Sequence, residues 1–179
     1  MTDPAPETHR LFFALWPDDG LRAALASAVD AVGVGGRGRR VAVAKYHVTL
    51  HFLGGWPEFP AGIVEAARDA ATRVRASAFE LVVDHAGGFT RSRVGWLAPA
   101  ANAGLDALWS SLGAALDAAE IPRRAAESFS PHVTVLRNVR GSIDPVPIQP
   151  LSWPVEDFVL VHSHGGRYDV LDRWKLAPA

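Results

Sequence analysis

His47-Val48-Thr49-Leu50 recurs later in the chain as His132-Val133-Thr134-Val135, and this repeat decides which fold the sequence indicates. Each copy lies in an alternating or apolar run that is typical of a β-strand. Because side chains alternate between the two faces of a strand, the His and the Thr of each copy project from the same face. Two such strands predict a pair of matching faces that hold one substrate between them.

The residue types in the repeat indicate acid–base chemistry at a phosphate. Imidazole has an unperturbed pKa of about 6.5, so both of its protonation states are populated near neutral pH. One His can therefore accept a proton while the other donates one. The Thr hydroxyls can donate hydrogen bonds to anionic oxygens. A single His-x-Thr segment is usually just a packed or exposed strand segment, but the repetition favours a catalytic pair.

Further segments match one family together with the two motifs. They are the first strand at 10–15, the motif regions at 47–54 and 131–137, the central strand at 91–97, and the closing hairpin at 160–163, 166–168 and 174–176. With these segments the chain resembles the RNA 2′,3′-cyclic phosphodiesterases, also called 2′-5′ RNA ligases, of the 2H phosphoesterase superfamily. The resemblance implies a bilobal α+β fold with two antiparallel sheets, outer helices in a pseudo-twofold arrangement and an active-site groove between the lobes. We expect residues 1–179 to form this single bilobal domain.

The resemblance also implies a reaction. This is metal-independent hydrolysis of an RNA 2′,3′-cyclic phosphate end to a 2′-phosphate, with in-line attack by water and no cofactor. By resemblance, His132 is the general base and His47 the general acid, although the sequence itself does not fix which is which. The roles would reverse in 2′-5′ ligation of RNA. Thr49 and Thr134 would bind the non-bridging phosphate oxygens.

Two further residues are candidates for substrate contacts. Arg137 would bind phosphate or stack on a base. Strict alternation from His132 and Thr134 places Arg137 on the opposite strand face, so a bulge or the end of the strand must bring it to the site. Phe13, on the first strand, is the candidate for base stacking. A core position for Phe13 agrees equally well with the sequence.

Two other functions are compatible with the same motifs. In the first, the substrate is a small cyclic phosphate such as ADP-ribose 1″,2″-cyclic phosphate. In the second, the chain is a non-catalytic RNA-binding module that keeps the groove. Intact His and Thr in both copies argue against the second function, because binding alone needs no matched acid–base pair.

The composition is that of an ordinary globular protein, with 49% hydrophobic and 21% charged residues. Without cysteine the chain has neither a disulfide framework nor a thiolate zinc site, and His162-x-His164 lacks a third ligand at a suitable spacing. The apolar run at 11–16 is too short for a signal peptide or a membrane span. We expect a cytoplasmic monomer whose partners are RNA with 2′,3′-cyclic phosphate ends or cyclic nucleotides.

The formal net charge is −1, yet basic residues cluster beside both motifs. The clusters comprise Arg37, Arg39, Arg40, Lys45, Arg91, Arg93, Arg123, Arg124, Arg137 and Arg140. They are either solvated loops or a local positive field that attracts a polyanion.

The pattern of apolar residues predicts the order of the elements. Strands are expected at 10–16, 46–53, 79–84, 93–98, 131–137, 154–163 and 167–176, and helices at about 18–32, 58–76 and 102–120. Asp18 and Asn102 are the expected N-caps. The proline-rich segment 141–154 is expected to be an irregular connection. The segment 33–38 matches the letters of a dinucleotide-binding loop, but a helix precedes it and a strand follows, so we expect a simple loop.

Overall fold

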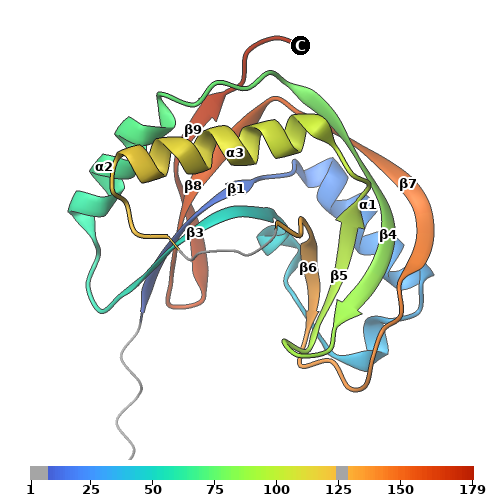
Figure 1. Ribbon diagram of the computed structural model, residues 1–179. Helices are drawn as coiled ribbons and strands as arrows, with labels where there is room; N and C mark the ends of the chain where they lie inside the picture. Colours follow the sequence, from blue (N-terminus) through green and yellow to red (C-terminus); the bar gives the residue numbers. More distant parts are fainter. Residues whose placement is uncertain (1–7, 124–128) are drawn as a thin grey trace, which may run out of the picture.

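The computed structural model describes residues 8–123 and 129–179, so Arg124 of the basic clusters lies outside the described residues. The centre of the fold is the contact between the two motif strands, β3 (Val48–Trp56) and β6 (Val133–Arg137). These strands are antiparallel, and Val48 pairs with Val133. The two copies of the repeat, far apart in the sequence, therefore lie side by side (Figure 1).

The motif strands are the two central strands of the order β7-β4-β5-β6-β3-β1-β8-β9, and the short strand β2 also pairs with β6. The remaining strands are β1 (His9–Leu15), β2 (Arg39–Arg40), β4 (Phe79–Phe89), β5 (Val94–Pro99), β7 (Val146–Val155), β8 (Asp157–His164) and β9 (Arg167–Lys175). All pairings between these strands are antiparallel. Each half thus contributes four strands of that order and one motif, which confirms the predicted α+β fold. The two predicted antiparallel sheets are joined through the β3–β6 pair into one nine-stranded sheet.

Three α-helices are present in the described residues: α1 (Asp19–Ala31), α2 (Ala61–Ala71) and α3 (Ala103–Ala118). Asp18 Oδ1 accepts a hydrogen bond from the Leu21 amide at 2.7 Å, and Asn102 Oδ1 accepts one from the Leu105 amide at 3.0 Å. Both predicted N-caps are therefore confirmed. Helix α2 starts later than expected because Pro60, at its N-cap, is suited to the start of a helix and not to its interior. It also ends earlier than expected, at Ala71.

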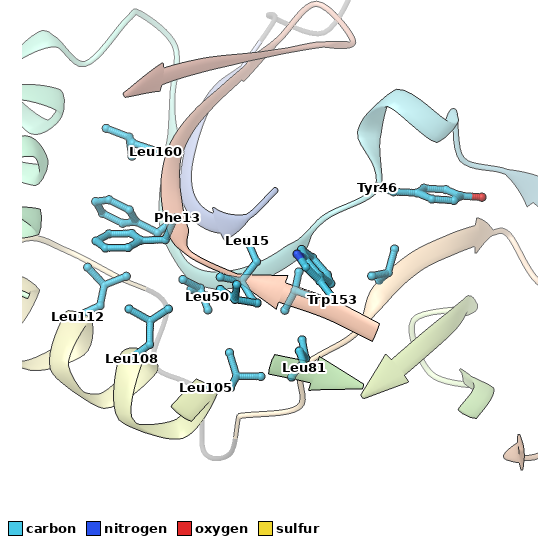
Figure 2. Packing of buried hydrophobic residues seen from close by; sticks show 14 of the residues in the cluster. Phe13, Leu15, Tyr46, Leu50, Leu81, Leu105, Leu108, Leu112, Trp153 and Leu160 are labelled. Atoms are coloured by element: carbon cyan, nitrogen blue, oxygen red, sulfur yellow. The ribbon is translucent and has the colours of Figure 1, made fainter. Parts of the chain in front are cut away.

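The main hydrophobic core lies between the sheet and all three helices, since Leu25 and Val29 of α1 belong to it together with residues of α2 and α3. Helix α3 contacts both β3 and β4 and so crosses both halves (Figure 1). Its leucines at helical spacing, Leu105, Leu108 and Leu112, are buried and meet side chains of the sheet (Figure 2). Full burial of one such side chain stabilises the fold by about 1.5–3 kcal/mol. This packing fixes one face of the sheet and leaves the opposite face for the motif side chains.

The proline-rich segment is not irregular, and this prediction was wrong. Most of it forms β7, which pairs with β4 from Phe79↔Val155 to Ala86↔Val146. Strand β7 lies at the end of the sheet order. An edge strand needs backbone donors on only one side, so it tolerates prolines that a central strand would exclude. Pro147, Pro150 and Pro154 are therefore compatible with this strand.

Two glycine-rich connections, at 33–38 and at 165–166, have different local structures. The segment at 33–38 contains a short 3-10 turn, Gly35–Arg37, and leads into β2, so it is not a strand-to-helix loop and the predicted simple loop is confirmed. Gly165 and Gly166 join β8 to β9 with φ values of 55° and 74°. Positive φ at both positions is typical of a type I′ turn, which glycine adopts without strain.

In the part of the chain that the structure describes, no helix has the length and apolar character needed to span a membrane. The single domain over residues 1–179 stays a prediction.

Candidate active site

The pairing of Val48 with Val133 brings the motif side chains to one face of the sheet. Both valines are fully buried in the core, so their neighbours in sequence project from the opposite face. Antiparallel register places His47 across from Thr134 and Thr49 across from His132. Directly opposite Cβ atoms in such a ladder are about 5 Å apart and diagonal ones about 7–8 Å. The two imidazoles therefore occupy diagonal corners of a four-residue site that is wide enough for a phosphate.

Hydrogen bonds orient the ring of His47. Its Nδ1 lies 2.7 Å from the carbonyl oxygen of Lys45, and its Nε2 lies 3.1 Å from the hydroxyl of Thr49. Since a carbonyl only accepts, Nδ1 carries the proton and donates it. In the neutral ring, Nε2 then accepts from the Thr49 hydroxyl. The unprotonated nitrogen of the neutral His47 ring is therefore Nε2, on the side of the threonine.

His132 is held in the same way. Its Nδ1 lies 2.8 Å from the carbonyl oxygen of Ser130, which is again two residues before the histidine. The same tautomer follows, with Nδ1 donating and Nε2 as the basic atom. Both copies of the motif thus use a backbone carbonyl to direct Nε2 toward the site.

Aromatic rings surround both histidines. The ring of His47 stacks on Phe12 at 4.9 Å and on Trp16 at 5.8 Å, and Tyr168 meets it edge-on at 5.7 Å between ring centroids. His132 has an edge-on contact with Phe89 at 5.0 Å. These rings restrict the imidazoles to one orientation and remove water from around them.

Burial lowers the pKa of both histidines. The pKa of His47 falls to about 4, chiefly because its ring is desolvated; the Lys45 carbonyl raises it, while the charges of His132, Arg137 and Arg22 lower it. Desolvation also lowers the pKa of His132, with a further lowering by Arg137 and a raising by the Ser130 carbonyl. Both imidazoles are therefore mainly neutral at pH 7 in the free protein.

The lowered pKa values predict an acidic optimum for kcat/KM. Acid–base catalysis by the pair needs one proton shared between two histidines, a state that exists only between the two pKa values of the coupled pair. Both values lie below the ordinary 6.5. We therefore expect kcat/KM for a cyclic phosphate to be greatest below pH 6.5 and to fall about tenfold per pH unit well above the optimum. An optimum above pH 7.5 in a rate profile would contradict this protonation scheme.

A β-bulge lies at the last residue of each motif and changes which of the following side chains reach the site. Phe13 pairs with His51 and Ala14 with Thr49, so Leu50 is the extra residue in β3. In β6, Gly95 pairs with Leu136 and Trp96 with Thr134, so Val135 is the extra residue.

The bulges invert the side-chain alternation beyond each Thr. His51 is 5% exposed and stacks on Trp109 at 5.0 Å, with Nε2 at 2.9 Å from the Trp109 carbonyl oxygen, so it packs in the core. Leu136 is likewise buried, and Arg137 is exposed on the motif face. The lowering of both histidine pKa values by Arg137 agrees with that placement. The bulge that Arg137 needed to reach the site is therefore present.

Phe13 is wrong as a base-stacking residue. Its side chain is fully buried and packs against Phe158 at 6.0 Å and Trp174 at 5.8 Å between ring centroids. Figure 2 shows it in the core, with the leucines of α3. The preceding residue, Phe12, faces the motif side and stacks on His47. The error is one of strand parity, since a shift by one residue exchanges the two faces.

Three residues near His47 were not predicted from the sequence: Arg22, Trp16 and Tyr168. Arg22 is 8% exposed and lies over the Trp16 ring at 5.0 Å, and Trp16 stacks on His47. Among the described residues, Nε and Nη2 of Arg22 have no hydrogen-bond partner. No motif marked these residues, because they come from α1, the segment before it and β9. The one signal in the sequence was the position of Arg22, on the apolar face of the predicted helix with Leu25 and Val29.

Other clusters lie outside the four-residue site. His9 stacks on His164 at 3.8 Å between ring centroids, and its Nδ1 lies 2.9 Å from Nε2 of His162. Over residues 8–123 and 129–179, no group of three or more His, Cys, Asp or Glu side chains is arranged to hold a metal ion.

Beside His132, a cavity of about 390 Å³ is lined by the rings of Phe89, Trp96 and Phe129 among others.

Known proteins resemble this chain in sequence and in fold. A sequence model of the 2′-5′ RNA ligase superfamily matches residues 17–167. The protein named RNA 2′,3′-cyclic phosphodiesterase from Escherichia coli K12 is 32% identical over 179 residues, which cover 95% of this chain and 98% of that protein. The crystal structure of E. coli LigT in apo form has a TM-score of 0.81 at 31% identity, covering 96% of this chain and 99% of LigT. The structure of LigT complexed with 3′-AMP has a TM-score of 0.76 at 32% identity, covering 95% and 98%.

Proposed function

Because this chain belongs to the 2′-5′ RNA ligase superfamily, we propose that it hydrolyses RNA 2′,3′-cyclic phosphate ends to 2′-phosphates. The observation that carries the proposal is the diagonal placement of His47 and His132 across the Val48–Val133 pair. The name of the E. coli relative, RNA 2′,3′-cyclic phosphodiesterase, supports the same substrate. The complex of LigT with 3′-AMP supports a nucleotide as the group that the groove binds.

The reaction needs one proton removed and one delivered. Nε2 of His132 accepts a proton from water as the water oxygen forms a bond to phosphorus. The bond from phosphorus to the 3′ oxygen breaks, and Nε2–H of His47 protonates that oxygen. The products are a 2′-phosphate monoester and a free 3′-hydroxyl. Proton exchange with solvent then returns both imidazoles to their starting states.

Thr49, Thr134 and Arg137 stabilise the charge on the phosphate. The hydroxyl of Thr49, which donates to Nε2 of His47 in the free protein, turns to a non-bridging oxygen when His47 is protonated. Thr134, across from His47, donates to the other oxygen. Arg137 adds a charge-assisted contact. The three side chains stand beside the site before substrate arrives, and donors held in place in this way are effective in a transition state.

Because the pKa of His47 is low, the ring must gain a proton before it can act as the general acid. The free protein holds His47 neutral, because burial and nearby positive charges disfavour its protonation. A bound phosphate brings a negative charge next to the ring, and a nearby opposite charge favours the protonated form. Substrate binding and protonation of His47 are therefore coupled. We also propose 2′-5′ ligation, in which the 5′-hydroxyl of a second RNA attacks the phosphorus in place of water. His132 would deprotonate that hydroxyl and His47 would again protonate the departing 3′ oxygen, so the expected exchange of roles does not apply.

The proposal is tested by comparing substrates. We expect kcat/KM for an RNA oligonucleotide ending in a 2′,3′-cyclic phosphate to exceed that for ADP-ribose 1″,2″-cyclic phosphate. The measurement is initial rates on both substrates at equal ionic strength. Greater activity on the ADP-ribose compound would favour a small-molecule phosphodiesterase. Tight RNA binding without turnover of either substrate would favour a binding module.

We further propose that the protein acts as a cytoplasmic monomer. Support for the monomer comes from the site itself, since both histidines, both threonines and Arg137 belong to one chain. No second copy is needed to complete it.

A further inference from the structure

We infer that a basic cavity beside the catalytic pair binds the phosphate on the 5′ side of the terminal nucleotide, which makes an RNA end a better substrate than a lone cyclic nucleoside phosphate. The inference rests on the proposed function and specifies its substrate.

The cavity has a volume of about 370 Å³. Strand β2 and the short turn Val43–Lys45 form one wall, and β6 and β9 contribute one residue each. Its charged lining residues are all cations, and the full lining is Arg39, Arg40, Val41, Ala42, Val43, Lys45, Arg137 and Tyr168. No carboxylate lines it, so the cavity selects for an anion.

The cavity adjoins the catalytic histidines directly. Lys45, in its wall, provides the carbonyl that accepts from Nδ1 of His47. Tyr168, in the opposite wall, meets the His47 ring edge-on at 5.7 Å. The charge of Arg137 acts on both histidines. A chain whose end is held between the histidines therefore has its next phosphate within reach of the cavity.

Two cations in the cavity repel each other unless an anion lies between them. Arg39 pairs directly with Arg137 across β2 and β6. Gly38 makes this close approach possible, because a Cβ there would lie 2.7 Å from the Arg137 carbonyl oxygen. Like charges directly opposite in a ladder are destabilising. In the described parts of the chain, neither Arg39 nor Arg137 has an ion-pair partner.

The other two cations are partly engaged already. Arg40 forms a salt bridge with Asp30, and Nζ of Lys45 donates to the carbonyl of Gly166 while it lies 5.2 Å from the Tyr168 ring centroid. Arg39 and Arg137 therefore have unused donors. Arg137 lines the cavity and its charge also acts on both histidines, so it can contact the reacting phosphate and the phosphate on its 5′ side together. A guanidinium pair matches the oxygens of a phosphodiester, to which arginine donates two hydrogen bonds at once.

Three substrates with the same terminal nucleoside test the inference: adenosine 2′,3′-cyclic phosphate, the same compound with a 5′-phosphate, and the dinucleotide ending in a 2′,3′-cyclic phosphate. The measured quantity is the ratio of kcat/KM with the 5′-side phosphate to kcat/KM without it. We expect a ratio of about 10–100 in the wild type, as hydrogen bonds to charged groups predict. Raising the salt concentration should shrink this ratio, because the contact is between ions.

Arg39→Met is the informative variant, because Arg39 is exposed in a two-residue strand and its loss leaves the core intact. We expect the ratio to fall to near 1 in Arg39→Met and to recover in part in Arg39→Lys. Arg73→Met is the matched control: it removes one exposed cation just after α2, the helix on the opposite face of the sheet, and it should keep the wild-type ratio.

The possible results distinguish failure of the proposed function from failure of the phosphate-binding cavity. A wild type that hydrolyses adenosine 2′,3′-cyclic phosphate with a ratio near 1 overturns the inference and leaves the proposed function intact. An unchanged ratio in Arg39→Met also overturns it. A wild type that turns over none of the three substrates overturns the proposed function, and the inference with it.

Discussion

Replacing either histidine of the proposed acid–base pair, His47→Ala or His132→Ala, is expected to lower kcat on an RNA 2′,3′-cyclic phosphate end by about 10²–10⁴-fold, the usual contribution of a positioned acid or base. Both rings are half-buried on the face opposite the core, and each is held through one Nδ1 hydrogen bond. The fold should therefore survive both replacements. Single-turnover rates at saturating substrate measure the loss, and circular dichroism checks the fold.

His9→Ala is a matched control, since His9 belongs to the separate cluster with His162 and His164. It should keep the wild-type rate. A drop of less than threefold in either catalytic variant would remove that histidine from the mechanism.

A modified leaving group distinguishes the acid from the base. Sulfur in place of the 3′ oxygen gives a leaving group that departs without protonation. The general-acid variant should therefore recover most of its rate on this substrate, while the general-base variant should not. Rescue of His47→Ala supports the proposed roles, and rescue of His132→Ala reverses them.

Removing one threonine hydroxyl is expected to have the second-largest effect. In Thr134→Val or Thr49→Val the side chain keeps its shape but loses its donor to the phosphate. We expect kcat to fall by about 10²–10³-fold, as for the loss of one donor that binds transition-state charge. Steady-state kinetics on the same RNA end measure this fall.

The serine variants are the controls for the threonines. Thr134→Ser and Thr49→Ser keep the hydroxyl and should retain most of the activity. Thr49→Val should also alter the pH dependence, because its hydroxyl donates to Nε2 of His47 and favours the neutral ring. Full activity in both valine variants would mean that other groups bind the phosphate oxygens.

The repeated His-x-Thr motif was sufficient to predict the centre of the fold. Two strands that carry the same chemistry at period two predict a shared face, and the Val48–Val133 pair provides that face. Helix starts were also predictable, because Asp18 and Asn102 cap their helices through local contacts.

Features that depend on neighbouring strands were not predictable. Phe13 and Phe12 are both apolar residues on one strand, and only the strands and helices around them decide which of the two faces the core. The bulges at Leu50 and Val135 appear only in the register with β1 and β5, and they determine that Arg137 faces the site while His51 does not. Strand β7 was missed because its prolines indicate a loop unless its position at the sheet edge is known.

Long-range packing decides the surroundings of the catalytic rings. Trp16 and Tyr168 are separated from His47 in sequence and meet it only after β1, β3 and the closing hairpin have assembled. Their contacts desolvate the ring and contribute to its low pKa. A sequence pattern identifies the candidate residue but not the environment that sets its pKa.

The most direct test of the two-histidine account is turnover of an RNA oligonucleotide ending in a 2′,3′-cyclic phosphate by the wild-type protein in EDTA, with identification of the product isomer. The account predicts complete conversion to the 2′-phosphate without added metal. Absence of turnover, or a 3′-phosphate product, would contradict it.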